Sequence, residues 1–174
     1  GRYEDLPLTI WSPTRSGVTV AKLRAAARLF ASQGNFGLLV VDYLQLLDAS
    51  APDRVRTEQV AEMSKGLKQI AREFKIPVLC LAQLNRTAET EGTPRLGHLR
   101  ESGSIEQDAD TVLFITRDLA NTDATLHVAK HRAGNDGTID LDFDKVKTRF
   151  YDRGHLIGSK AANYFDAHNQ ETFQ

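Results

Sequence analysis

The sequence predicts an α/β fold, in which helices flank a mostly parallel β-sheet and a β-hairpin follows. The first observation is a pair of apolar, β-branched runs at 37–46 and 78–82, because strands without a polar face occur mainly in parallel sheets covered on both faces. The second is the alternation of these runs with helical patterns at 19–33 and 55–74, the order that produces right-handed parallel βαβ units.

The elements of the first half of the chain follow from local patterns. A short strand is predicted over 6–11, with Pro7 near its start, where a missing N–H is tolerated. In the helix over 19–33, apolar residues recur at helical spacing and Gly34 supplies a suitable stop. The helix over 55–74 is the strongest, with an apolar face made by Val60, Met63, Leu67, Ile70, Ala71 and Phe74. Met63 in such a stripe indicates core packing rather than a ligand.

The second half of the chain predicts mainly strands. A short helix is expected within 98–109, followed by a strand over 110–115. The stretches 125–130 and 138–143 are predicted to form a hairpin. We expect one domain over 1–151 and a poorly ordered tail over 152–174, where the sequence becomes polar and loses its pattern.

Composition excludes several classes of protein. The chain has 174 residues, 41% of them hydrophobic and 26% charged, as in one globular domain that buries its own core. With 22 Lys+Arg against 23 Asp+Glu, any nucleic-acid contact must come from a local basic site. The single cysteine, Cys80, lies in an apolar run, which predicts a buried core thiol in a reducing, cytoplasmic setting. No apolar stretch or targeting motif indicates export or a membrane.

Asp42 is the first candidate functional residue, because it ends a predicted central strand. Open α/β sheets bind their ligands at the carboxyl ends of the strands. The segment therefore resembles a Walker B motif, whose aspartate holds Mg²⁺, usually through water, beside nucleotide phosphates. The alternative is an aspartate that only caps the next helix.

Four segments, in this order, resemble the C-terminal, RecA-like motor domain of the DnaB-type replicative DNA helicases. They are Val-Val-Asp-Tyr-Leu-Gln-Leu at 40–46, Leu-Ala-Gln-Leu-Asn-Arg at 81–86, Leu-Arg-Glu-Ser-Gly-Ser-Ile-Glu-Gln-Asp-Ala-Asp at 99–110, and Ala-Lys-His-Arg-Ala-Gly at 129–134. The third is the most specific because of its length. The resemblance spans roughly residues 6–145 and implies a RecA-like sheet with ATP and Mg²⁺ as cofactors.

The resemblance implies roles for four residues at the nucleotide. Asp42 resembles the Walker B acid that orders Mg²⁺ and its waters, and Gln83 resembles the sensor of the γ-phosphate. Lys130 and Arg132 alternate at a strand end and resemble the lysine and arginine finger that act on ATP bound to the neighbouring subunit. The alternatives are an amide that bonds the strand end and a basic surface pair.

Four other residues fall where the family places its DNA-binding loops. The resemblance implies that Arg86, Arg100, Glu101 and Gly103 lie in loops that, in this family, face the central channel of the ring and grip single-stranded DNA. An arginine supplies a charge-assisted bond and a glycine permits close backbone approach, whereas Glu101 would fix an arginine or a neighbouring loop. The alternative for each residue is an ordinary solvated position.

The family also implies an assembly and a reaction. A finger that acts in trans requires a ring, here a homohexamer with each ATP site at a subunit interface. Single-stranded DNA is the expected partner, with primase and a helicase loader as further candidates. The expected reaction couples ATP hydrolysis to 5'-3' translocation on single-stranded DNA and to duplex unwinding.

One departure from the family is the absence of Gly-x-x-x-x-Gly-Lys-Ser/Thr from the sequence. We therefore expect this chain to be a partial domain, without the N-terminal part of the fold, that does not hydrolyse ATP alone. Missing strands would also leave apolar surface exposed. Two alternatives remain open, namely a fragment of a RecA- or RadA-type recombinase, and a non-catalytic module that binds DNA or helicase subunits.

Overall fold

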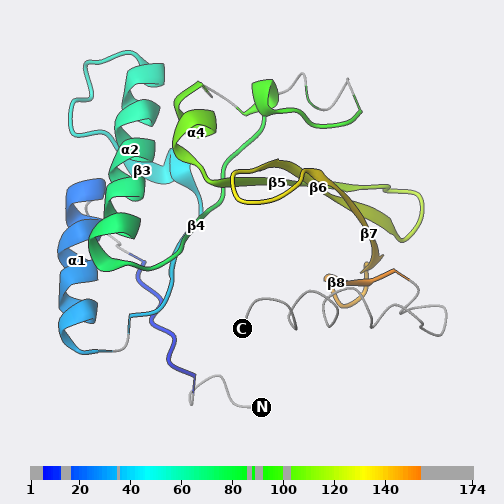
Figure 1. Cartoon of the computed structure of the whole chain (residues 1–174), viewed down its shortest axis with the longest axis horizontal. Helices are drawn as coiled ribbons and strands as arrows, with labels where there is room; N and C mark the ends of the chain where they lie inside the picture. Colours follow the sequence, from blue (N-terminus) through cyan, green and yellow to red (C-terminus); the bar gives the residue numbers. More distant parts are fainter. Residues whose placement is uncertain are drawn as a thin grey trace. The chain divides into compact units, whose positions relative to one another are not determined.

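The computed structural model describes residues 6–12, 17–34, 36–85, 88, 92–99 and 103–153. The chain divides into two compact units. The first comprises Gly1–Thr90 and Leu96–Ala109, and the second comprises Glu91–Arg95 and Asp110–Gln174. Helices and short parallel strand pairs make up the described part of the first unit, and a four-stranded antiparallel sheet makes up that of the second (Figure 1).

Helix α1 spans Val20–Ser32, close to the limits that the sequence predicts. The Thr19 side chain caps its start by accepting a hydrogen bond from the Lys22 backbone N–H at 3.3 Å. After its last turn the chain reverses at Gly34, whose φ of 78° lies in the left-handed region that glycine tolerates. The predicted helix over 19–33 is therefore confirmed.

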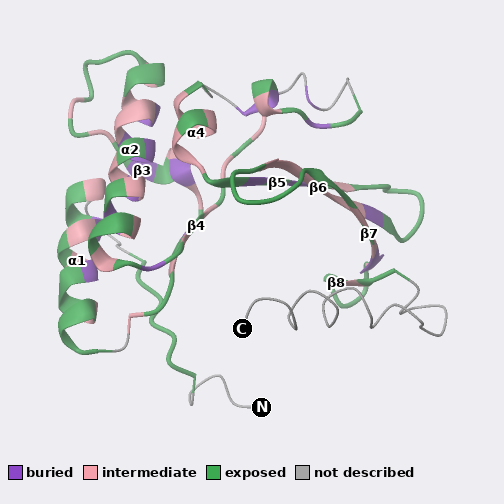
Figure 2. Cartoon of the chain, viewed as in Figure 1, coloured by how far each residue is buried: buried purple, intermediate pink, exposed green. Residues whose placement is uncertain are grey.

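Helix α2 spans Arg56–Phe74, and its apolar face is the centre of the core of the first unit (Figure 2). The predicted helix over 55–74 is confirmed, and Met63 is 1% exposed, as expected of a core residue. The buried residues of this core are Leu23, Ala27, Val41, Leu44, Leu47, Val60, Met63, Leu67 and Ile70. They come from α1, from α2 and from the segment 41–47, so helix packing positions the segment that contains Asp42.

Two parallel strand pairs belong to the first unit. Strand β2 (Leu39–Val41) pairs with β4 (Val78–Cys80), and β1 (Val18–Thr19) pairs with β3 (Leu47–Asp48). The order β2–α2–β4 confirms the predicted parallel βαβ arrangement. Strands β1 and β3 have two residues each, which is too short for any periodicity to predict them.

Two strand predictions in the first unit are wrong in part or in whole. Residues 6–12 form no strand, and the Leu8 N–H instead donates to the Leu6 carbonyl at 2.7 Å in a local turn. The strand expected over 37–46 ends at Val41, because Leu44–Leu46 turns into a 3₁₀ helix, η2. Propensity alone does not make a strand, since each strand also needs a hydrogen-bonded neighbour.

One face of the β2–β4 pair is exposed, contrary to the expectation of burial on both faces. Val40 and Leu79 are register partners and are 51% and 52% exposed. Leu38, just before β2, and Leu81, just after β4, are also 51% and 43% exposed. The β2–β4 pair therefore has an exposed apolar face in the described part of the first unit.

Two short helices complete the described part of the first unit. The 3₁₀ helix η3 spans Leu96–His98, and α4 spans Gly103–Asp108 beside α2 (Figure 1). The short helix expected within 98–109 is therefore confirmed. Ile105 of α4 packs against the core cluster, so this helix is anchored by an apolar contact to the same core as α2.

The second unit contains the antiparallel sheet β5–β6–β7–β8. Strand β5 spans Thr111–Arg117, β6 spans Asp123–His131, β7 spans Gly137–Asp144 and β8 spans Arg149–Asp152. The predicted hairpin is confirmed as β6 and β7, and the predicted strand over 110–115 is confirmed as β5. Strand β8 was not predicted, and its last residue lies in the predicted tail, of which residues 154–174 lie outside the described residues.

Strand β8 is held to the sheet by an aromatic contact. Phe143 of β7 is 4% exposed, and its ring centroid lies 4.7 Å from that of its register partner, Phe150. The guanidinium carbon of Arg117 lies 4.3 Å from the centroid of the Phe143 ring. Cross-strand side-chain pairs of this kind stabilise a sheet. The contact of Phe150 with Phe143 therefore stabilises β8, whose four residues are too few to show a strand pattern in the sequence.

Composition-based expectations have mixed outcomes. Cys80 is a free thiol, but it is only partly buried rather than a fully buried core residue. Burial still raises the pKa of the Cys80 thiol to about 11. Among the residues described, no helix is both long and apolar enough to span a bilayer.

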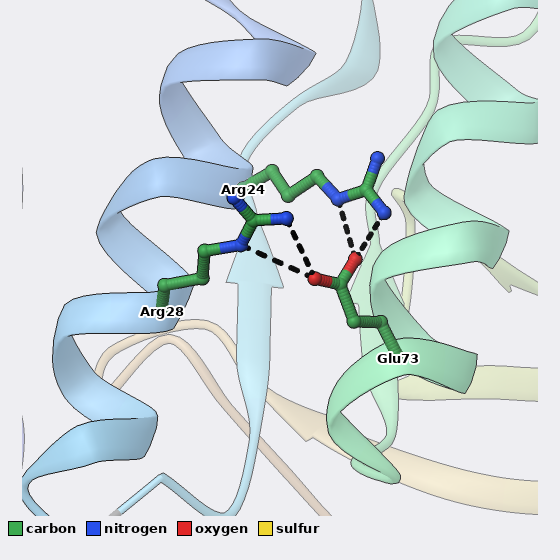
Figure 3. Close-up of polar contacts among 3 residues, drawn as sticks. All are labelled: Arg24, Arg28 and Glu73. Carbon is green, nitrogen blue, oxygen red and sulfur yellow. Dashed lines mark hydrogen bonds and ion pairs between the residues drawn. The ribbon is translucent and has the colours of Figure 1, made fainter.

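Helices α1 and α2 are joined on the surface by two arginines that share one carboxylate. Glu73 of α2 accepts hydrogen bonds from Arg24 and, at 3.2 and 3.1 Å, from Arg28, both of α1 (Figure 3). The hydrogen bond from Arg24, and then that from Arg28, hold the pKa of the Glu73 carboxyl below its ordinary value. The charged carboxylate therefore favours the folded chain.

The Glu73→Gln variant should be less stable than the parent chain at neutral pH. Because the folded-state pKa of Glu73 is lowered, the difference should persist above the ordinary glutamate pKa of about 4.3 and disappear as the pH falls through the lowered value. Urea midpoints measured across this pH range test the prediction. The matched control is Glu62→Gln, since Glu62 lies 3.9 Å from Arg54 in a much looser pair. An equal pH dependence in both variants would contradict the assignment.

Candidate functional site

The ends of β2 and β4 meet at one edge of the first unit. Val41 pairs with Cys80 in parallel register, and the hydrogen bonds continue past the strands. The Leu81 N–H donates to the Val41 carbonyl at 2.9 Å, and the Leu44 N–H donates to the Leu81 carbonyl at 2.8 Å. Asp42 follows β2 directly and Gln83 follows β4, so both residues leave the same edge.

Asp42 and Gln83 are both exposed at this edge. No group of three or more His, Cys, Asp or Glu residues that could hold a metal ion occurs in the described part of the chain. A lone exposed carboxylate still suits Mg²⁺, which is usually bound by one or two carboxylates together with waters and substrate phosphates. The donor chemistry of Asp42 therefore fits the expected ion, and an all-protein cation cage is not required.

Gln45 joins the two strand ends, a connection that was not predicted. Its side-chain Oε1 accepts a hydrogen bond from the Gln83 backbone N–H at 3.2 Å. Its own carbonyl accepts a bond from the Arg56 guanidinium at 3.1 Å, which ties this segment to the start of α2. The one available signal was that Gln45 lies three residues after Asp42 in the same motif. Its partner, 38 residues away, could not be read from the sequence.

The segments expected to contact DNA are only partly described. Arg86, Arg100 and Glu101 lie outside the described residues. Gly103 is the first residue of α4 and is exposed, and a Cβ built on it would meet nothing within 4 Å. Packing against the described residues therefore does not require a glycine at 103, and the expected role of Gly103 at a ligand stays a prediction.

Backbone hydrogen bonds join the residues just before Arg86 to the residues just before Arg100. Leu84 and Leu99 form an isolated antiparallel bridge, and the Asn85 N–H donates to the His98 carbonyl at 2.8 Å. Gln83 directly precedes Leu84, so one short stretch connects the strand end that carries Gln83 to the residue before Arg100. No local pattern predicts this bridge, because a single pair of residues has no periodicity.

Lys130 and Arg132 lie at one end of the sheet of the second unit. Lys130 is partly buried near the end of β6, opposite Val112 of β5, and Arg132 is exposed just after the strand. The Arg132 N–H donates to the Asp110 carbonyl at 2.8 Å, which continues the pairing beyond β5 and β6. The expected alternation, with His131 between the two cations, agrees with this register.

The predicted site residues therefore form two groups. Asp42 and Gln83 leave the same edge of the strand pair in the first unit, and Lys130 and Arg132 lie at one end of the sheet in the second. A carboxylate beside an amide at the ends of parallel strands suits a nucleotide with its metal ion. Two cations on an antiparallel strand end suit a phosphate-bearing ligand.

Comparison with known proteins gives consistent matches. The family model described as "DnaB-like helicase C terminal domain" matches residues 1–152. The "Replicative DNA helicase DnaB" of Treponema pallidum is 42% identical over 150 residues, covering 86% of this chain and 34% of that protein. The protein of the same name from Haemophilus influenzae is 42% identical over 145 residues, covering 78% of this chain and 31% of that protein. The chain thus spans about a third of the length of these relatives.

Solved structures agree with these sequence matches. One, described as an "ATPase Domain", has a TM-score of 0.72 and 34% identity, covering 78% of this chain and 52% of that chain. Another, described as "The Structure Of A DnaB-Like Replicative Helicase And Its Interactions With Primase", has a TM-score of 0.73 and 34% identity, covering 80% of this chain and 36% of that chain. These likenesses confirm the predicted RecA-like α/β fold class.

Proposed function

This chain belongs to the DnaB-like helicase C-terminal domain family, and on that premise we propose that the protein containing it is a replicative DNA helicase. The enzyme couples ATP hydrolysis to 5'-3' translocation on single-stranded DNA and to unwinding of the duplex in the cytoplasm. The observation that supports this most directly is that Asp42 and Gln83 follow the hydrogen-bonded ends of β2 and β4 at the same edge.

At the nucleotide, Asp42 orders the waters of Mg²⁺, and Gln83 donates from its amide to an oxygen of the γ-phosphate. Bound Mg²⁺ supplies charge neutralisation at the phosphate oxygens. Because the Gln83 backbone is bonded to Gln45 and Leu84 is bridged to Leu99, loss of the γ-phosphate at Gln83 is transmitted along this stretch toward the DNA-binding loops.

The second group of residues acts on a neighbouring subunit. Lys130 and Arg132 serve as the lysine and the arginine finger that stabilise charge on the transferring phosphoryl group of ATP bound to the neighbouring subunit. This arrangement needs a closed ring, and we propose a homohexamer with an ATP site at each interface. The register of β6 against β5 places both cations at one strand end, which supports a shared role for Lys130 and Arg132.

Single-stranded DNA is the proposed ligand of the loops that contain Arg86, Arg100, Glu101 and Gly103. The arginines neutralise phosphates, so affinity should fall as salt rises. Primase and a helicase loader are proposed partners of the whole protein. Support for primase comes from the structural neighbour that is described together with its primase interactions.

We also assign the phosphate-binding loop to a part of the protein outside these 174 residues. The sequence contains no Gly-x-x-x-x-Gly-Lys-Ser/Thr motif, and the chain covers about a third of the length of the relative from Treponema pallidum. The isolated chain should therefore neither bind ATP tightly nor hydrolyse it. Titration with a fluorescent ATP analogue and Mg²⁺ measures this, and saturable tight binding would contradict the assignment.

The test of the proposed function is Asp42→Asn in the full-length protein. Removing this charge should lower Mg²⁺-dependent ATPase activity by about 100-fold or more, because several kcal/mol of charge stabilisation depend on the ion. Unwinding of a forked DNA substrate should fall in parallel. The matched control is Asp48→Asn, which removes an exposed carboxylate at the end of β3.

Asp48→Asn should keep ATPase activity within about two-fold of the parent, since most surface substitutions have small effects. If both variants retain activity, Asp42 is not the metal-binding residue. If both lose it equally, the effect comes from general damage to this part of the fold and not from the metal.

A further inference from the structure

Arg132 is held by Asp110 at two points. The Arg132 backbone N–H donates to the Asp110 carbonyl at 2.8 Å, and its guanidinium NH1 lies 3.1 Å from Asp110 Oδ1. Asp110 directly precedes β5 and Arg132 directly follows β6, so the contact extends the sheet by one pair. Both residues belong to the second unit. The backbone hydrogen bond fixes the Arg132 backbone beside Asp110, and the ion pair holds the guanidinium at the Asp110 carboxylate.

The ion pair itself adds little to stability. The Arg132 and Asp110 side chains are 55% and 59% exposed, and ion pairs in such positions are screened by water and salt. An arginine side chain, however, has many rotamers, and ordering them in advance removes an entropy loss from any later step that uses the guanidinium. The consequence of this pair is therefore orientation of Arg132 rather than stability of the fold.

We propose that Asp110 is the positioning residue of the Arg132 finger, an inference that rests on the proposed function. The carboxylate fixes the guanidinium at the end of β6 before the neighbouring subunit presents its ATP. A guanidinium has five N–H donors, so it can donate to Asp110 and to a phosphate oxygen at the same time. In this proposal Asp110 acts through Arg132 and not on the substrate itself.

Steady-state kinetics of the full-length helicase provide the first test. Asp110→Ala should lower kcat for ATP hydrolysis by about 3- to 10-fold, the loss expected when the guanidinium spreads over several rotamers, with KM for ATP nearly unchanged. Asp110→Asn keeps an acceptor oxygen but loses the charge, so kcat should fall by less than in the alanine variant, by about 2- to 4-fold. The expected order of activity is Asp, then Asn, then Ala.

The matched control is Asp123→Ala. Asp123 is an exposed aspartate of the same sheet that pairs with an arginine, Arg153, at 2.6 Å. Its loss should leave kcat within about two-fold of the parent, as for most surface substitutions. If Asp110→Ala fails to assemble, Asp110→Asn carries the test alone, and an unchanged kcat in that variant overturns the inference.

Rings of mixed subunits separate positioning from general damage. A subunit with Asp110→Ala keeps its own nucleotide residues but supplies a misplaced finger to its neighbour. A subunit with Asp42→Ala lacks the metal-binding acid but supplies a normal finger. Where the two meet in the right order, one complete site forms, so the mixture should hydrolyse ATP faster than the average of the two pure rings.

The same mixture with Arg132→Ala distinguishes the two proposals. If Arg132→Ala subunits gain no activity when mixed with Asp42→Ala subunits, the trans finger is wrong and the proposed function must be revised. If Arg132→Ala gains activity but Asp110→Ala does not, the finger stands and Asp110 has only a structural role within its own subunit. If both gain activity, both proposals are supported.

Discussion

If Arg132 is the proposed finger, replacing it with alanine in the full-length protein should lower kcat for ATP hydrolysis by about 10³- to 10⁵-fold, the range known for arginine fingers. In the proposed finger role the guanidinium stabilises charge that develops only as the phosphoryl group transfers, so KM for ATP should change little. Arg132→Lys should recover only part of the activity, because a single ammonium group cannot reproduce the planar fork. Steady-state ATPase assays with saturating single-stranded DNA measure all three quantities.

A second exposed arginine of the same sheet provides the control. Arg149 of β8 lies over the Tyr151 ring, with its guanidinium carbon 5.2 Å from the ring centroid. Arg149→Ala removes the same charge from the second unit without touching the end of β6, and it should keep kcat within about two-fold of the parent. An Arg132→Ala variant that retains more than about a tenth of the parent kcat would exclude a finger of ordinary strength.

Ile70→Ala should have the largest effect on stability, lowering the free energy of unfolding of the chain by about 2–5 kcal/mol. Ile70 is 0% exposed and lies in the core that joins α1, α2 and the segment around Asp42. Truncation removes apolar contacts and leaves a cavity that the surrounding helices fill only in part. Urea unfolding followed by circular dichroism should show a lower midpoint with an unchanged slope.

Leu29→Ala is the matched control for this variant. Leu29 lies on α1 of the same unit but is 59% exposed, so its truncation should change the free energy of unfolding by about 0.5 kcal/mol or less. A similar loss in both variants would mean that Leu29 is covered in solution. A loss below about 1 kcal/mol for Ile70→Ala would contradict the core described above.

Periodic elements were predictable because their signals are local. The apolar stripes of α1 and α2 repeat every three or four residues, and the burial of Met63 and Ile70 follows from that repeat alone. The hairpin β6–β7 likewise follows from two strand-like runs flanking a Gly-containing turn. A strand pattern at 6–11 was equally local, but it formed no strand because strands also depend on a neighbour.

The candidate site was predictable only as separate residues. Motif resemblance named Asp42, Gln83, Lys130 and Arg132, since each stands in a recognisable run of sequence. Nothing in those runs predicted that Gln45 bonds the Gln83 backbone or that Asp110 holds Arg132. These contacts join residues 38 and 22 positions apart, and no periodicity connects them.

The sequence by itself therefore determined the α/β class, both long helices, the family resemblance and the chemical type of each candidate residue. Only the tertiary structure decided which strands found partners, where the strand before Asp42 ended, and which face of the β2–β4 pair stayed exposed. The physical reason is that helix and strand patterns reflect neighbours along the chain. Strand pairing and side-chain contacts depend on residues that only folding brings together.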